Sequence, residues 1–161
     1  MKKKQKIKGV TLLEILIVLS ILGILALISV LTLYSRFRGN LLNETSQKIA
    51  FYLELAREKS IAQDQGENWG VYFGNPSGTD NSFFSLFYGN NYSPANSVEK
   101  IYLPKKVEFS DPADNSSKEI IFQKITGFLK GGSDNSVTIY LEENPSQTKT
   151  INVNLKGLVS N

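Results

Sequence analysis

An apolar run of 24 residues, from Val10 to Leu33, constrains this chain more than any other feature of its sequence. Glu14 is the only residue in the run with an ionisable side chain. As a helix rising about 1.5 Å per residue, the run reaches roughly 36 Å, more than the hydrocarbon core of a bilayer at about 30 Å. We therefore expect residues 10–33 to cross a membrane as a helix. A carboxylate inside such a segment is costly and is usually retained for a function.

Residues 1–9 form a short basic leader in front of this run. They hold five lysines and no acidic residue, so the positive-inside rule keeps them in the cytoplasm. We expect a single-pass protein of the inner membrane with an exported C-terminal domain. The formal charge of the chain is +3, yet from Val10 onward it carries 13 basic and 15 acidic side chains, a net charge of −2. The excess of basic residues therefore lies in the leader and is no evidence for a DNA-binding domain.

The junction between the leader and the run has a recognisable order of residues. Gly9, Val10, Thr11, two leucines and Glu14 precede the long apolar segment, and this arrangement resembles the type IV prepilin signature. The signature is shared by type IV pilins and by the pseudopilins of type II secretion. The resemblance implies that a prepilin peptidase cuts between Gly9 and Val10 and methylates the new amino group of Val10. Most members begin the mature chain with phenylalanine, so Val10 departs from the pattern while keeping an apolar residue there.

The resemblance also implies a role for Glu14 in filament assembly. In the bilayer its carboxylate lies about 6 Å inside the apolar boundary, where it reaches the surface or takes up a proton. In a filament of packed helices, the nearest cation is the amino group of Val10 on a neighbouring subunit. Only cleavage creates that charge, because an attached Gly9 leaves a neutral amide. We therefore expect an ion pair between Glu14 and Val10 of adjacent subunits.

Three plainer interpretations remain open. An ordinary secretory signal peptide has an apolar core of about 7–15 residues and a cleavage site of small residues, whereas this run is longer and residues 33–36 offer no such site. A signal anchor without processing also fits the length of the run. Thr11 and Glu14 match a capping box, in which both side chains satisfy backbone N–H groups at a helix start. The capping box explains the spacing of Thr11 and Glu14 but not the glycine of the leader.

Helical periodicity continues past the apolar run. Residues suited to one buried face recur every three or four positions: Leu42, Thr45, Ile49, Tyr52 or Leu53, Ala56 and Ser60. No proline occurs before Pro76, so nothing interrupts the helix. The sequence predicts one helix over residues 10–65, capped at its C-terminal end by Gly66. Its first half, residues 10–33, is apolar all round, and its second half, residues 34–65, is amphipathic and is expected to pack on a domain.

From Gly66 the pattern changes to short alternating runs separated by glycine, asparagine, aspartate, serine and proline. The runs predict strands over residues 69–73, 82–88, 98–103, 107–109, 119–125, 137–141 and 151–155. Residues 66–161 are therefore expected to form a globular, β-rich domain. The predicted fold class is α+β, with a long N-terminal helix packed on a C-terminal antiparallel β domain.

Several of these segments are similar to the GspH/FimT-like minor pseudopilins. The resemblance rests on a helix segment with a Leu-Ala-Arg stretch and on hydrophobic strands, a glycine turn and a glycine-containing tail in the β domain: residues 51–62, Ile121, Phe122, Gly127, residues 137–141, Ile151, Val153, Gly157 and Val159. Together with the leader, it extends over most of the chain and implies a pilin-like fold.

The composition excludes several kinds of chemistry. The chain has no cysteine and no histidine, which removes disulfides, Ser-His-Asp and Cys-His catalysis and the usual zinc sites. Two acidic clusters, which begin at Asp111 and Asp134, do not fit a calcium loop of the EF-hand type. We expect no catalytic residue, metal or cofactor. The aromatic segment 83–88 is expected to be a strand enclosed between helix and loops, with a subunit contact or stacking on single-stranded DNA as alternatives.

We therefore expect a minor structural subunit of a type II secretion pseudopilus or a type IV pilus. Its expected partners are prepilin peptidase, other pilin or pseudopilin subunits, the inner-membrane assembly platform and membrane lipid. One alternative is a minor pilin whose exposed domain binds DNA for uptake or a secreted substrate. Nucleic acid is not favoured, because the best basic patch holds only Lys100, Lys105 and Lys106. The other alternative is a signal-anchored exported hydrolase, for which the sequence offers no nucleophile–base pair.

Overall fold

The structure of the chain is a computed structural model that describes residues 12–76 and 81–161, apart from the side chains of residues 27–39. Two compact units divide the chain. The first ends at Gly39, and the second, Asn40–Asn161, contains the end of the long helix and all the strands described below.

Part of the predicted N-terminal region lies outside the described residues. This applies to Gly9, Val10 and Thr11, and to the side chains of residues 27–33 within the predicted membrane segment, residues 10–33. The large apolar side chains at the described start of the helix are exposed. Within the described residues, no helix is apolar over enough of its length to cross a membrane.

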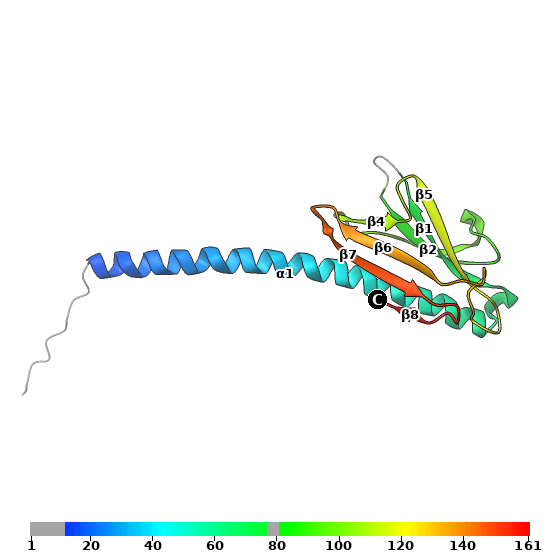
Figure 1. The fold of residues 1–161 in the computed structure, drawn as a ribbon. Helices are drawn as coiled ribbons and strands as arrows, with labels where there is room; N and C mark the ends of the chain where they lie inside the picture. Colours follow the sequence, from blue (N-terminus) through cyan, green and yellow to red (C-terminus); the bar gives the residue numbers. More distant parts are fainter. Residues whose placement is uncertain (1–11, 77–80) are drawn as a thin grey trace, which may run out of the picture. The chain divides into compact units, whose positions relative to one another are not determined.

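Helix α1 (Leu12–Ile61) is a single α-helix of 50 residues (Figure 1). One unbroken helix was predicted and is confirmed, but it ends earlier than predicted. Gln63 has left-handed backbone angles with φ 55, and a short 3₁₀ turn, η1 (Asp64–Gly66), follows it. The backbone N–H of Trp69 donates to the hydroxyl of Ser60 at 2.8 Å. The early end therefore lets the chain turn back, so that Trp69 enters the core with only 1% of its surface exposed.

The described strands of the second unit form two four-stranded antiparallel sheets. Sheet A has the order β3-β2-β1-β5, and sheet B has the order β4-β6-β7-β8. The strands are β1 (Trp69–Asn75), β2 (Phe83–Tyr88), β3 (Ser97–Tyr102), β4 (Val107–Asp111), β5 (Ser116–Phe122), β6 (Asn135–Leu141), β7 (Asn144–Val153) and β8 (Val159–Ser160). The predicted α+β fold with an antiparallel β domain is confirmed. Strands β5 and β7 begin earlier in the sequence than predicted, and β8 is an additional short strand.

The second half of α1 packs on the sheets through the stripe that the sequence predicted. Every residue of the stripe is buried: Leu42, Thr45, Ile49, Tyr52, Leu53, Ala56 and Ser60. The ring of Tyr52 meets that of Phe84 in β2 with 5.4 Å between centroids. Phe73 of β1 and Phe109 of β4 meet edge to face at 5.7 Å and link the two sheets. One hydrophobic core therefore joins α1 to both sheets.

The outer face of sheet A, away from α1, is partly covered by the loop between β2 and β3. This loop contains a 3₁₀ turn, η2 (Pro94–Asn96), and carries Tyr92. The ring of Tyr92 stacks on Tyr72 at 3.9 Å and meets Phe87 edge to face at 5.6 Å. Phe87 is fully buried as a result, while Phe84 faces the core on the other side of β2. The prediction of an aromatic strand enclosed between helix and loops is confirmed for residues 84–87, whereas Phe83 and Tyr88 are only partly buried.

Candidate functional site

Glu14 lies in the first turn of α1. A negative side chain at this position is stabilised by the partial positive charge at the start of a helix. Its neighbours Leu12 and Leu13 are 81% and 68% exposed, so the helix start presents a carboxylate on an otherwise apolar surface. Val10, its predicted partner, lies outside the described residues. The ion pair between subunits therefore stays a prediction.

Arg57, from the Leu-Ala-Arg stretch, lies where α1 meets the loop after β5 and the C-terminal tail. A β-carbon placed on Gly127 would lie 3.1 Å from Arg57 Cγ, and one placed on Gly157 would lie 3.0 Å from Arg57 Nε. The Nε atom is buried and has no hydrogen-bond partner within the described residues. Because the two glycines have no side chains, the arginine packs closely against both loops. Arg57, Gly127 and Gly157 therefore form one junction, which we call the arginine–glycine junction.

The C-terminal tail is held along the helix by further contacts. The backbone N–H of Leu129 donates to the carbonyl oxygen of Leu155 at 3.0 Å. The side-chain amide of Asn161 donates to the hydroxyl of Ser46 in α1 at 3.1 Å, and β8 runs beside the helix (Figure 1). The tail and the arginine–glycine junction thus fix the position of α1 on sheet B.

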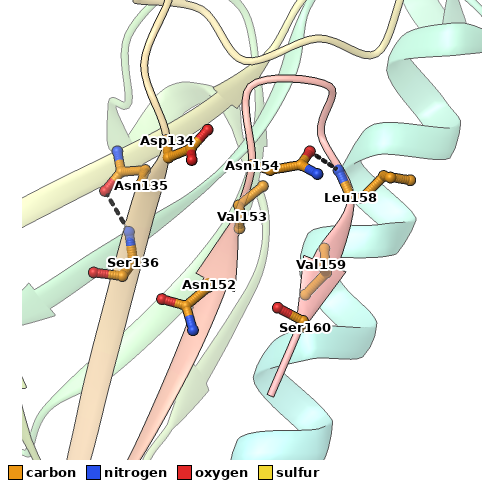
Figure 2. Close-up of a pocket in the computed structure, with 9 residues that line it drawn as sticks. All are labelled: Asp134, Asn135, Ser136, Asn152, Val153, Asn154, Leu158, Val159 and Ser160. Atoms are coloured by element: carbon orange, nitrogen blue, oxygen red, sulfur yellow. Dashed lines mark hydrogen bonds between the residues drawn. The ribbon is translucent and has the colours of Figure 1, made fainter.

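A hollow of about 450 Å³ lies where β6 begins and β7 ends (Figure 2). The side chain of Asn154 accepts a hydrogen bond from the N–H of Leu158 at 2.9 Å. Asp134 accepts one from the N–H of Leu155 at 2.6 Å, and Asn135 accepts one from the N–H of the next residue at 2.9 Å. These polar groups hold the turns at this end of sheet B. Figure 2 shows the side chains that line the hollow: Asp134, Asn135, Ser136, Asn152, Val153, Asn154, Leu158, Val159 and Ser160.

The two acidic clusters noted in the sequence are engaged in the fold. Asp111 forms an ion pair with Lys118, and Asp114 receives a hydrogen bond from the amide of Asn75 at 3.3 Å. Asp134 accepts the backbone hydrogen bond described above. Among the described residues, no three acidic side chains are placed to hold a metal ion together.

Two tyrosines have raised pKa values. Burial, and after it the hydrogen bond to Glu108, raises the pKa of Tyr140 above its usual value. Burial, followed by a hydrogen bond to Glu99, raises the pKa of Tyr52. Both hydroxyls stay protonated well above neutral pH, so they serve as hydrogen-bond donors rather than as bases.

Comparisons with known proteins concern two features of the chain, its N-terminal sequence and its fold. Residues 4–30 match the prokaryotic N-terminal methylation motif. No curated protein matches the sequence of the chain. Two crystal structures of the type IV minor pilin FimU from Pseudomonas aeruginosa (strain PAO1) have a similar fold. One is 12% identical and covers 74% of this chain and 90% of its own, with a TM-score of 0.53. The other is 13% identical and covers 76% of this chain and 89% of its own, with a TM-score of 0.55.

The chain carries the prokaryotic N-terminal methylation motif and has a pilin-like fold. The motif comes from its N-terminal region and the fold likeness extends over about three quarters of the chain, so the two findings support each other. The prepilin motif implies processing by a peptidase and assembly with other pilin subunits.

Sequence reasoning did not identify every notable surface of this chain. It singled out Glu14 and the residues of the arginine–glycine junction, the latter through resemblance alone. It did not predict the groove on sheet A described below, because that groove depends on which strands pair. The glycine and the aromatic residues that line this groove can be read from the sequence. The sequence does not show which residues of the neighbouring strands lie beside them.

Proposed function

We propose that this pilin-like chain is a minor subunit of a type IV pilus or of a type II secretion pseudopilus. In this proposal, prepilin peptidase cuts between Gly9 and Val10 and methylates Val10. Residues 10–33 anchor the chain in the inner membrane, with the leader in the cytoplasm and the β domain exported. The observation that carries the proposal is the methylation motif at residues 4–30, which includes Glu14 in the first turn of α1.

Assembly would depend on an ion pair between Glu14 and the amino group of Val10 on the next subunit. Two opposite charges about 4 Å apart attract each other by roughly 4 kcal/mol at an effective dielectric near 20. Removing one partner of a buried pair typically costs about 3–5 kcal/mol, because the other charge is left without compensation. That difference is enough to decide whether a subunit enters the filament. The pair also requires an axial offset between helices, so it would set their register.

Leader cleavage is tested with Gly9→Leu. A bulky residue at the cleavage position should block the peptidase, so the chain keeps its leader. In cells that contain the peptidase, mass spectrometry of the N-terminus should then find Met1 in the variant and a methylated Val10 in the wild type. Gly23→Leu is the matched control, because Gly23 has open space around it. Cleavage of Gly9→Leu at the wild-type rate would contradict the proposed site.

Filament entry is tested with Glu14→Gln, which keeps the size of the side chain and removes its charge. We expect normal cleavage and membrane insertion but at least about a hundredfold lower incorporation, as follows from losing a buried ion pair. Incorporation is measured by immunoblotting of sheared filaments against the cell-bound pool. Glu58→Gln, an exposed carboxylate on the same helix, is the control and should enter normally. If Glu14→Gln enters as well as Glu58→Gln, the pairing argument is wrong.

A further inference from the structure

The outer face of sheet A carries a row of aromatic rings. Alternate residues of each strand point away from the core, which brings Tyr102, Phe83 and Tyr72 onto neighbouring strands of this face. Their centroids lie 6.1 Å apart from Tyr102 to Phe83 and 5.7 Å apart from Phe83 to Tyr72. Tyr92 continues the row by stacking on Tyr72. Tyr102, at the other end, is 57% exposed.

A groove of about 450 Å³ lies beside this row, above Gly74 of β1. A β-carbon placed on Gly74 would lie 2.8 Å from ring atoms of Phe83 and 3.0 Å from the ring of Tyr72. The two rings therefore lie across the glycine and form the floor of the groove. We call it the Gly74 groove, and the residues that line it are Tyr72, Gly74, Asn75, Pro76, Phe83, Asn115, Ser116 and Ser117.

The wall of the Gly74 groove supplies hydrogen-bonding groups without charge. Ser117 is directly opposite Gly74 in the register between β1 and β5, and Asn115 precedes that strand. Both residues are exposed, and within the described residues neither side chain has a hydrogen-bond partner. None of the described residues that line the groove is charged. The groove therefore combines an aromatic floor with free amide and hydroxyl groups on one side.

The charges on the rest of this face are few and of both signs. The ammonium group of Lys100 lies over the ring of Phe83 at 3.7 Å and 5.0 Å from the ring centre of Tyr102. The carboxylate of Glu119 lies on the same face and accepts a hydrogen bond from the N–H of Tyr92 at 3.2 Å. A groove for a nucleic acid needs several cations to neutralise phosphates. This face instead suits a neutral ligand that has both a flat apolar side and hydroxyl groups.

We propose that the Gly74 groove binds a neutral oligosaccharide. The apolar face of one sugar ring would stack on Tyr102, which is 57% exposed, and the next would extend past Phe83 into the Gly74 groove. Asn115 and Ser117 would bond to the sugar hydroxyls and give the site its orientation. The proposal goes beyond the structural role in a filament and does not depend on it, because binding is tested on the isolated chain.

Isothermal titration calorimetry on the full chain tests this proposal. The chain is kept in an amine-oxide detergent, which has no sugar head group, and is titrated with chitohexaose, cellohexaose and maltohexaose. We expect saturable binding of at least one of the three. Tyr102→Ala removes a ring, and Ser117→Phe fills the groove, so each should weaken that binding by about tenfold or more. Phe128→Ala, which changes an exposed aromatic residue beyond the opposite end of β5, should leave binding unchanged.

Three outcomes would overturn the proposal. The first is no saturable binding of any of the three sugars. The second is equal affinity in the wild type, Tyr102→Ala and Ser117→Phe, with thermal unfolding showing that both variants are folded. The third is binding of a twelve-nucleotide oligothymidine that depends on Tyr102 in a protein that binds none of the sugars. That result would assign the face to single-stranded nucleic acid instead.

Discussion

At the scale of single residues, the arginine–glycine junction shows why particular side chains are required. Gly157 has φ +76, and a β-carbon there would collide with the carbonyl oxygen of Gly127. Gly127 also has positive φ, at +65, and its missing side chain leaves room for Arg57 and Ile61. Both glycines are therefore needed for two reasons at once, backbone conformation and close approach. The junction depends on them more than on any hydrogen bond to the arginine.

Gly157→Ala should therefore lower the stability of the fold by more than the strain of an alanine at this positive φ alone would. We expect a loss of about 2 kcal/mol or more in the free energy of unfolding, from strain plus the collision with Gly127. The measurement is a urea titration followed by the fluorescence of Trp69, the only tryptophan in the chain. Gly132→Ala separates the two causes, because Gly132 has φ +73 and open space around it. The Gly132→Ala variant should lose about 1 kcal/mol of unfolding free energy. An equal loss in both variants would contradict the proposed collision between a side chain at position 157 and Gly127.

At the scale of elements, the helix shows what periodicity can and cannot predict. The buried stripe of α1 was predictable because an amphipathic helix repeats its apolar residues at a fixed spacing. The end of the helix was not, since it depends on Ser60 accepting a hydrogen bond from Trp69 and on the carbonyl of Asp64 accepting one from the indole of the same residue at 3.0 Å. These are contacts across a turn, and they oppose the helical tendency of residues 62–65.

The strands show the same division between local pattern and pairing. Residues 116–118 are polar and precede the predicted strand 119–125, yet they begin β5 because they pair with the end of β1, which includes Gly74 and Asn75. Pro145 lies between the predicted strands 137–141 and 151–155, but in the structure it is inside β7. The register there is irregular, since Tyr140 pairs with Thr148 and the next residue of β6 pairs with Asn144. Proline is tolerated in such a bulge because its missing N–H is not needed by the ladder.

At the scale of the whole molecule, the two candidate sites differ in how far the sequence predicts them. The cleavage and pairing residues are contiguous, so Gly9, Val10 and Glu14 could be identified from spacing and resemblance. The Gly74 groove joins residues from β1, β2 and the start of β5, and only the register between them places Ser117 beside Gly74 and Phe83. A groove of this kind cannot be found from one sequence unless the strand pairing is known.

The division of the chain into two units leads to a prediction about folding. All buried apolar side chains of the described core lie at or beyond Leu42, and they form one cluster within the second unit. A fragment of residues 40–161 should therefore fold without the first 39 residues and unfold in one cooperative step. Circular dichroism and a urea titration of the fragment measure its folding and the cooperativity of its unfolding.

Ile49→Ala in the same fragment should lower the free energy of unfolding by about 2–5 kcal/mol, because the Ile49 side chain of α1 is fully buried against the sheets. A gradual transition, or no effect of Ile49→Ala, would show that the second unit needs the rest of the chain to form its core.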